Sequence, residues 1–249
     1  MNYLFTLPLI KTPPSKGFGL YSLTHIAVLI LITLFIIWLV RVYLQSDILG
    51  RPQMRKWIAV VAIASDLLFR EGISAMFGQF DPTLLPLHLC GMSMFIMVWD
   101  AFKPNRLTRS VLYSFSLWGA VAALLFADWA NRPILNVFVW QSFLVHALLI
   151  AYPMMLLVSG EMKPSFKDIP WSLLYLVVAV PIAIGANNIW GTNFWFLASG
   201  SAGSPLEPIL KAVGTTWYIP TLFVLLMVLW LILYLPWQLT SKKTTKAVA

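Results

Sequence analysis

The stretch SLTHIAVLILITLFIIWLVRVYL, residues 22–44, decides the fold. About 20 predominantly apolar residues in a helix span the ~30 Å hydrocarbon core of a bilayer, so this stretch is long enough to cross a membrane. Arg41 lies near its end, where a secretory leader would carry small residues at a cleavage site. We therefore expect the stretch to stay in the protein as its first membrane helix rather than to be removed as a signal peptide.

Similar apolar windows recur along the chain and predict seven membrane helices in a single domain over residues 1–249. Of the 249 residues, 60% are hydrophobic and 10% are charged. Soluble domains usually contain about 25% charged residues, so we expect an all-α, polytopic integral membrane protein with a seven-helix bundle. The predicted spans are about 22–44, 57–77, 83–102, 110–130, 134–158, 169–190 and 216–239.

The basic residues between these spans predict the orientation. Lys11, Lys16, Arg132 and Lys211 fall on the side of the N-terminus, and twelve other lysines and arginines fall on the opposite side. Lysine and arginine are enriched in cytoplasmic loops, which places the N-terminus outside and the C-terminus in the cytoplasm. The same rule accounts for the net charge of +8, so we do not expect a nucleic acid partner.

In this topology the polar residues inside the spans gather in the outer half of the bundle. A charge at the bilayer centre costs at least ~3 kcal/mol, so such residues usually face a polar interior and serve a function. We therefore predict a site at this depth, with Cys90, Asp128 and His146 around one cavity. The residues that fall in the outer half or near mid-depth include His25, Arg70, His88, Cys90, Asp128 and His146.

Cys90 is the strongest nucleophile of this group, although a lone cysteine is more often a small buried hydrophobe. His88 lies two residues away and would point in a nearly opposite direction on a regular helix. We therefore consider His146 or His25 a better base for the thiol, because a neutral imidazole is cheap to bury and exchanges a proton near neutral pH. Asn193, His88 or backbone amides are candidates to steady an oxyanion.

Other polar residues leave alternatives open. Asp128 either orients a histidine or pairs with Arg132, and Arg70 either pairs with Asp66 or holds a lipid phosphate. Three histidines and several carboxylates would also permit a zinc site. The chain lacks HxxxH, HExxH and CxxC spacings, so we expect no metal and no cofactor.

Four stretches of the chain resemble a known family. They are LPLHLC at 85–90, LYSFSLWGAVAALLFAD at 112–128, FLVHALLIAYPMMLLVSGEMKP at 143–164 and NNIWGTNFWFL at 187–197. These are similar to the YwaF-like bacterial integral membrane proteins, which are related to eukaryotic transmembrane protein 164, an acyltransferase acting on lyso-ether phospholipids. The resemblance implies Cys90 as nucleophile, His146 as its base, and a bacterial plasma membrane as the location.

The chain departs from this family in its outer loops. It has Phe126-Ala127-Asp128 where the family usually has a proline before the aspartate, and ASGSAG follows NFWFL. These differences bear on the substrate more than on the core of the site. The sequence favours an intramembrane acyltransferase or acyl-ester hydrolase that acts on membrane phospholipids or other lipid esters. The alternatives are a zinc-dependent lipid hydrolase with histidine and Asp128 ligands, and a non-enzymatic lipid-binding or transport protein.

Overall fold

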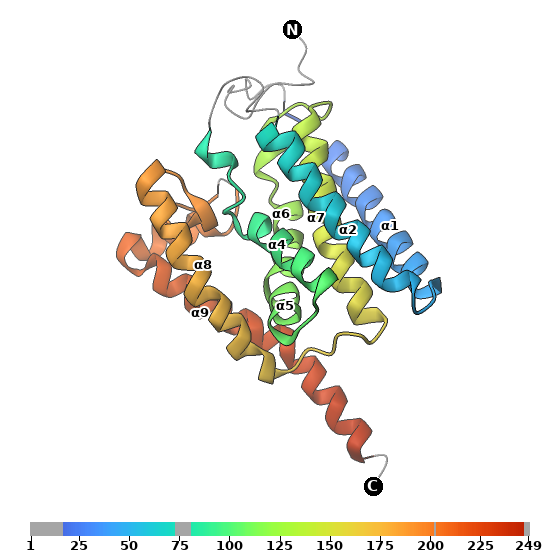
Figure 1. Ribbon diagram of the computed structural model, residues 1–249. Coiled ribbons are helices and arrows are strands. Elements are labelled where there is room, and N and C mark those ends of the chain that lie inside the picture. The colour runs from blue at the N-terminus through green and yellow to red at the C-terminus, as the bar shows by residue number, and fades with distance from the viewer. Residues whose placement is uncertain (1–16, 73–80, 202, 247–249) are drawn as a thin grey trace.

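The chain folds into helices joined by short turns, as the computed structural model shows (Figure 1). The structure describes residues 17–72, 81–201 and 203–246, without the side chains of 70, 71 and 240–246, and this part contains no strand. The all-α prediction is confirmed. The α-helices are α1 Leu23–Gln45, α2 Gly50–Asp66, α4 Leu89–Phe102, α5 Arg106–Val111, α6 Trp118–Leu125, α7 Val137–Val158, α8 Ile169–Trp190 and α9 Leu206–Lys246.

Two π-helices extend this set. Leu67–Gly72 continues α2, and Leu112–Leu117 joins α5 to α6. Five helical segments of the described chain are long and apolar enough to cross a membrane. They are Leu23–Gln45, Arg106–Asn131, Val137–Val158, Phe166–Trp190 and Leu206–Leu239.

The chain is thus a multi-pass membrane protein. The count of seven spans and the orientation of the termini remain predictions. α4 is the shorter apolar helix that corresponds to the third predicted span. α2 contains the first part of the second predicted span, 57–77, and its first residues include Arg51, Arg55 and Lys56, which lower its mean hydropathy.

Helix α7 lies at the centre of the bundle and contacts α1, α2, α4 and α6 (Figure 1). Its most apolar window is 72% buried, whereas the corresponding windows of α1 and α9 are 22% and 17% buried. A helix that is apolar on all sides is stable only where neighbours or lipid cover it. α1 and α9 expose large apolar side chains such as Leu31, Trp38 and Ile232, which suits a surface covered by lipid.

The third predicted span begins later than the sequence indicates. Residues 82–84 form one 3-10 turn, and α4 starts only at Leu89 with His88 as its N-cap, in an extended conformation (φ −65°, ψ 157°). Pro86 has no amide hydrogen to donate, and its carbonyl folds so closely over Gly91 that a Cβ there would lie 2.6 Å from it. The expectation that His88 and Cys90 share one regular helix is therefore wrong.

Other span boundaries also differ from the predictions. The segment that contains α5 and α6 begins at Arg106, after a capping box made by Asn105 and Thr108. Its α-helix ends at Leu125, so Asp128 opens a separate 3-10 turn. The last helix begins at Leu206, and Gly214 interrupts it with φ 71° and ψ 172°, just before the predicted start of the span.

Candidate functional site

The segment before α4 and the loop after α8 meet at one end of the bundle. The indole Nε1 of Trp195 donates to the carbonyl of Leu87 at 2.9 Å, and its backbone N–H donates to Nδ1 of His88 at 3.4 Å. The His88 ring packs against Phe194 and Phe196, with ring centres 5.0 and 5.4 Å apart. Two of the four family-like stretches thus form one structural unit beside Cys90.

This loop holds a strained backbone. Trp195 and Phe196 have φ values of 61° and 55°, a left-handed conformation that costs bulky residues roughly 1–3 kcal/mol. The Oδ1 atom of Asn187 stabilises it by accepting from the backbone N–H of Phe194 at 2.6 Å and from the hydroxyl of Thr192 at 2.9 Å. Such strain persists where the surroundings fix it, often at functional sites.

Asn193 closes the same loop. Its Nδ2 donates to the carbonyl of Ser199 at 2.9 Å, and its Oδ1 accepts from the N–H of Ala198 at 2.9 Å. Both ends of the amide that the sequence offers for an oxyanion are therefore engaged within the loop. In this arrangement, Asn193 maintains the shape of the segment that covers His88.

Cys90 is the second residue of α4 and is half-buried. It lies near enough to Tyr175 of α8 for the two side chains to interact electrostatically. The Tyr175 hydroxyl is buried and has no hydrogen-bond partner in the described part of the chain. The Tyr175 ring packs against Phe115 and Trp195, with centres 5.4 and 6.1 Å apart. The buried hydroxyl without a partner, within electrostatic range of the thiol, makes Tyr175 a candidate site residue.

Sequence reasoning missed Tyr175. It lies within the apolar sequence of the sixth predicted span, where a tyrosine is usually a core residue whose hydroxyl finds a partner. A second orphaned group lies nearby, because the Nε1 of Trp230 is also buried without a partner in the described chain. The Trp230 ring packs on Phe115 at 5.3 Å. Both aromatic side chains thus carry polar atoms toward the interior without a protein acceptor.

His25 has a partner for each ring nitrogen. The backbone N–H of Tyr21 donates to Nδ1 at 3.0 Å, so Nδ1 carries the lone pair. Nε2 lies 3.0 Å from the carbonyl of Leu124, which can only accept, so Nε2 carries the proton. The ring is fully buried. His25 therefore ties the start of α1 to the end of α6 and has no lone pair to offer a thiol or a metal.

His146 has the opposite protonation pattern. Its Nδ1 lies 2.6 Å from the carbonyl of Ser142, one turn earlier in α7. The carbonyl can only accept, so Nδ1 carries the proton and Nε2 carries the lone pair of the neutral ring. The ring stacks on Trp129 at 5.0 Å and 28°, which fixes its plane. α7 packs directly against α4, the helix of Cys90.

The model of the TMEM164 family matches residues 20–234. The chain belongs to the TMEM164 family. The match includes every candidate residue from His25 to Asn193 and confirms the predicted relationship to transmembrane protein 164. No curated protein and no solved structure gives a match to the chain.

Two predicted site residues of this TMEM164 family member lie in different settings. Asp128 is exposed at the start of the 3-10 turn Asp128–Asn131. Nδ1 of His146 is held by a backbone carbonyl, the position at which an orienting carboxylate would bind. Arg70 lies in the π-helix Leu67–Gly72, and its side chain is outside the described part. Asp66, its predicted partner, is buried and accepts from Nε2 of Gln141 at 3.0 Å.

Within the described ranges, no group of three or more histidine, cysteine and acidic residues is arranged to hold a metal ion. The partners of His25 bear directly on the zinc alternative, because a ligating nitrogen must have a lone pair. His25 is already bonded at both nitrogens. A three-histidine ligand set would have to break its bonds to Tyr21 and Leu124.

The opposite end of the bundle contains a charge network that sequence reasoning missed. Glu161, in the turn after α7, forms an ion pair with Arg55 and accepts from the hydroxyl of Tyr43 at 2.7 Å. The Arg55 guanidinium also donates to Tyr43 at 2.7 Å, and Arg109 donates to the carbonyl of Glu161. Burial disfavours the charged carboxylate, but the bond from Tyr43 and the attraction of Arg55 outweigh burial and lower the pKa of Glu161.

Proposed function

We propose that this protein is an intramembrane acyl-transfer enzyme that acts on lipid esters, with Cys90 as nucleophile and His146 as general base. The observation that carries the proposal is the hydrogen bonding of His146. A base must offer a lone pair, and the bond from Nδ1 to Ser142 leaves that lone pair on Nε2. His25 and His88 each use Nδ1 as an acceptor, so neither has this tautomer.

The position of Cys90 supports a nucleophilic role. The first amides of an α-helix have no acceptors within the helix, and the N-terminus carries a partial positive charge that favours a thiolate. Cys90 lies in the first turn of α4, and the His88 side chain does not cap this helix. The first-turn amides can therefore stabilise negative charge that develops beside the thiol.

Two side chains add to this set of donors. His88 accepts at Nδ1, so its Nε2 carries a proton that can be donated to an oxyanion. The Tyr175 hydroxyl is a second donor that has no acceptor in the described chain. Oxyanion donors act best in a site from which water is excluded, and the rings of Phe115 and Trp195 pack against the Tyr175 ring.

The chemistry follows from these roles. The Cys90 thiol transfers its proton to Nε2 of His146, and Sγ forms a bond to the ester carbonyl carbon. The tetrahedral oxyanion collapses, the bond to the alkoxide breaks, and His146 returns the proton so that an alcohol leaves. A lipid hydroxyl or water then attacks the Cys90 thioester, giving its proton through His146 to Sγ. The mechanism requires Nε2 within about 3 Å of Sγ, or one water between them.

Intact-protein mass spectrometry tests the proposal. Purified protein is incubated with dioleoyl phosphatidylcholine vesicles, and we expect an added oleoyl mass that hydroxylamine removes, as it does for a thioester. Cys90→Ala should lose the adduct and all acyl transfer. It should still fold, because a small side chain replaces another small one. An adduct that survives in Cys90→Ala would assign the nucleophile elsewhere.

The same assay separates the rival functions. Turnover that persists in Cys90→Ala and stops when tightly bound zinc is removed would indicate the metallohydrolase. A protein that binds the lipid but forms neither adduct nor product, with phosphatidylcholine, phosphatidylethanolamine and phosphatidylglycerol each tried as acyl donor, would indicate a non-enzymatic lipid-binding or transport role.

A further inference from the structure

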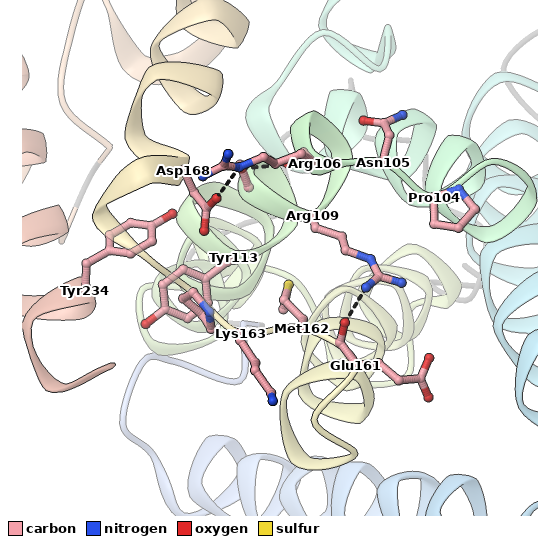
Figure 2. A pocket seen from close by; sticks show the side chains of 12 residues that line it. Pro104, Asn105, Arg106, Arg109, Tyr113, Glu161, Met162, Lys163, Asp168 and Tyr234 are labelled. Carbon is pink, nitrogen blue, oxygen red and sulfur yellow. Dashed lines mark hydrogen bonds and ion pairs between the residues drawn. The ribbon is translucent and has the colours of Figure 1, made fainter. Parts of the chain in front are cut away.

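Two cavities meet at the end of the bundle opposite Cys90. A polar cavity of about 450 Å³ lies between the start of α5, the turn after α7 and Tyr234 of α9 (Figure 2). An apolar groove of about 810 Å³ lies between α1, α6, α7 and α9. Tyr113 lines both, and residues 232–237 of α9 contribute to each. A ligand with a polar head and an apolar chain would fill the two together.

The polar cavity has positive charge that its acidic residues do not neutralise. Asp168 pairs with Arg106 at 2.8 Å (Figure 2). Glu161 pairs with Arg55, which lies outside the lining. Lys163 is exposed and has no acidic partner in the part of the chain that the structure describes. Because both acids in the wall are already paired, the cavity favours an anionic ligand.

Arg109 is the second cation in the wall, and Asp100, outside the lining, lies within ion-pair distance of it. Its Nε is buried without a hydrogen-bond partner among the described residues. It lies 3.8 Å from Asp100, whose carboxylate already accepts from Thr108 at 2.6 Å and from Tyr152 at 3.0 Å. A guanidinium presents several donors in a fixed plane that matches a phosphate. Arg109 and Lys163 are thus two cations in the wall of one cavity.

The boundary between the two cavities is amphipathic. The Tyr113 hydroxyl donates to the carbonyl of Leu233 at 2.7 Å and accepts from Nε1 of Trp237 at 2.9 Å. Tyrosine and tryptophan are enriched at the level of lipid headgroups. Beyond them the groove is lined by apolar side chains, and the hydroxyl of Thr33 is turned to the carbonyl of Leu29 in its own helix. Such a wall suits an acyl chain.

We propose that the two cavities bind one anionic phospholipid. Its phosphate lies at Arg109 and Lys163, and an acyl chain lies in the groove between α1, α6, α7 and α9. The headgroup part of this site is separate from the proposed acyl-transfer site, because the fourteen residues of α4, about 20 Å of helix, lie between the two ends. The proposal therefore stands or falls independently of catalysis at Cys90.

Native mass spectrometry of the full chain in detergent tests the headgroup part. Dioleoyl phosphatidylglycerol should remain bound at lower concentrations than dioleoyl phosphatidylcholine, which has the same chains but no net charge. Lys163→Gln should weaken phosphatidylglycerol binding about fivefold, since a basic residue near a lipid surface contributes about 1 kcal/mol. Lys167→Gln is the matched control, because Lys167 is also exposed at this end but does not line the cavity.

The acyl-chain part of the proposal is tested with Thr33→Trp, which fills the groove from α1. Leu34→Trp is the control, because it adds the same ring at a position outside the lining. Only Thr33→Trp should weaken phosphatidylglycerol binding. Soluble glycerol phosphate should bind far more weakly than the lipid. Equal binding of both lipids, equal binding of glycerol phosphate and phosphatidylglycerol, or the same effect from a variant and its control would each overturn the proposal.

Discussion

The two ends of this bundle differ in how their buried polar groups are bonded. Around Glu161, the charged groups form one network, in which Arg55 and Tyr43 bond the carboxylate and each other, although the Nε atoms of Arg55 and Arg109 have no hydrogen-bond partner in the described chain. Around Cys90, the hydroxyl of Tyr175 and the indole of Trp230 are buried without partners in the described chain. A buried polar group that lacks a partner costs about 1–3 kcal/mol. At the Glu161 end, ion pairs offset part of this cost.

Backbone geometry follows the same division. The loop over His88 contains two non-glycine residues in the left-handed region, Trp195 and Phe196. At the other end, Asn105 and Thr108 form a complete capping box before α5. The strained backbone lies at the Cys90 end, whereas the capping box and the ion pairs lie at the other end, which indicates that the bundle is anchored at the Glu161 end. A site for chemistry is expected at the end where unsatisfied groups await a substrate.

The largest effect should come from replacing His146, the proposed general base. His146→Gln is expected to lower the rate of acyl release from phospholipid vesicles by a factor of about 10²–10⁴, because glutamine cannot accept a proton. His25→Gln is the matched variant. Its amide can still donate to the Leu124 carbonyl, the bond that Nε2 of His25 makes, so most activity should remain. Similar losses in both variants would remove the distinction between the two histidines.

Breaking the network around Glu161, at the end of the bundle opposite Cys90, should change stability rather than the rate of acyl transfer. Glu161→Gln leaves Arg55 buried without its counter-charge, and losing one partner of a buried pair costs about 3 kcal/mol. The thermal unfolding midpoint in detergent should fall accordingly, with the rate per folded molecule retained. Asp168→Asn is the control, because the Arg106 side chain of that pair is half-exposed, and exposed pairs contribute about 0–1 kcal/mol.

Much of the fold could be predicted because lipid imposes a simple requirement on sequence. Long apolar windows predict helices, and helices occur in each of the seven predicted places at least in part. The start of α4 was harder to predict. Pro86 indicates a bend, but the approach of its carbonyl to Gly91 depends on how the chain folds back before Leu89.

The candidate site could be predicted only as a set of residues. The roles of the histidines depend on carbonyl groups that sequence does not place: His25 bonds Leu124, 99 positions away. In the sequence, Glu161 is an acid that follows a predicted span and has no distinguishing neighbour. Its partners Tyr43 and Arg55 lie 118 and 106 positions away. In the sequence, only the hydroxyl of Tyr175 distinguishes it from the apolar residues around it. Pairings of this kind arise from tertiary packing and leave no local pattern.

A smaller effect is expected from the backbone contact that shapes the Cys90 end. Gly91→Ala would place a methyl group 2.6 Å from the carbonyl of Pro86, which belongs to the backbone and cannot rotate away. We expect a loss of about 1–3 kcal/mol in the free energy of unfolding, as for other overpacked positions. Gly119→Ala should cost less, because its new methyl would meet the end of the flexible Leu89 side chain at 3.0 Å. Chemical unfolding curves of the two variants decide the comparison.

The smallest expected effect is a pH dependence of stability that arises at Glu161. Although burial opposes its charge, the partners of Glu161 hold its pKa below the ordinary value of 4.5. Near this pH, the folded state therefore binds fewer protons than the unfolded state. The stabilisation is complete above about pH 4.5 and is lost as the pH falls through the lower pKa of the folded state.

The unfolding midpoint, measured from pH 6 to pH 3, should fall further in the wild type than in Glu161→Gln. Lys211 also lowers the pKa of Glu207 at the other end, but this pair is exposed and screened by solvent, so Glu207→Gln should change the slope less than Glu161→Gln does. Parallel curves for the wild type and Glu161→Gln would mean that this carboxylate does not anchor the bundle.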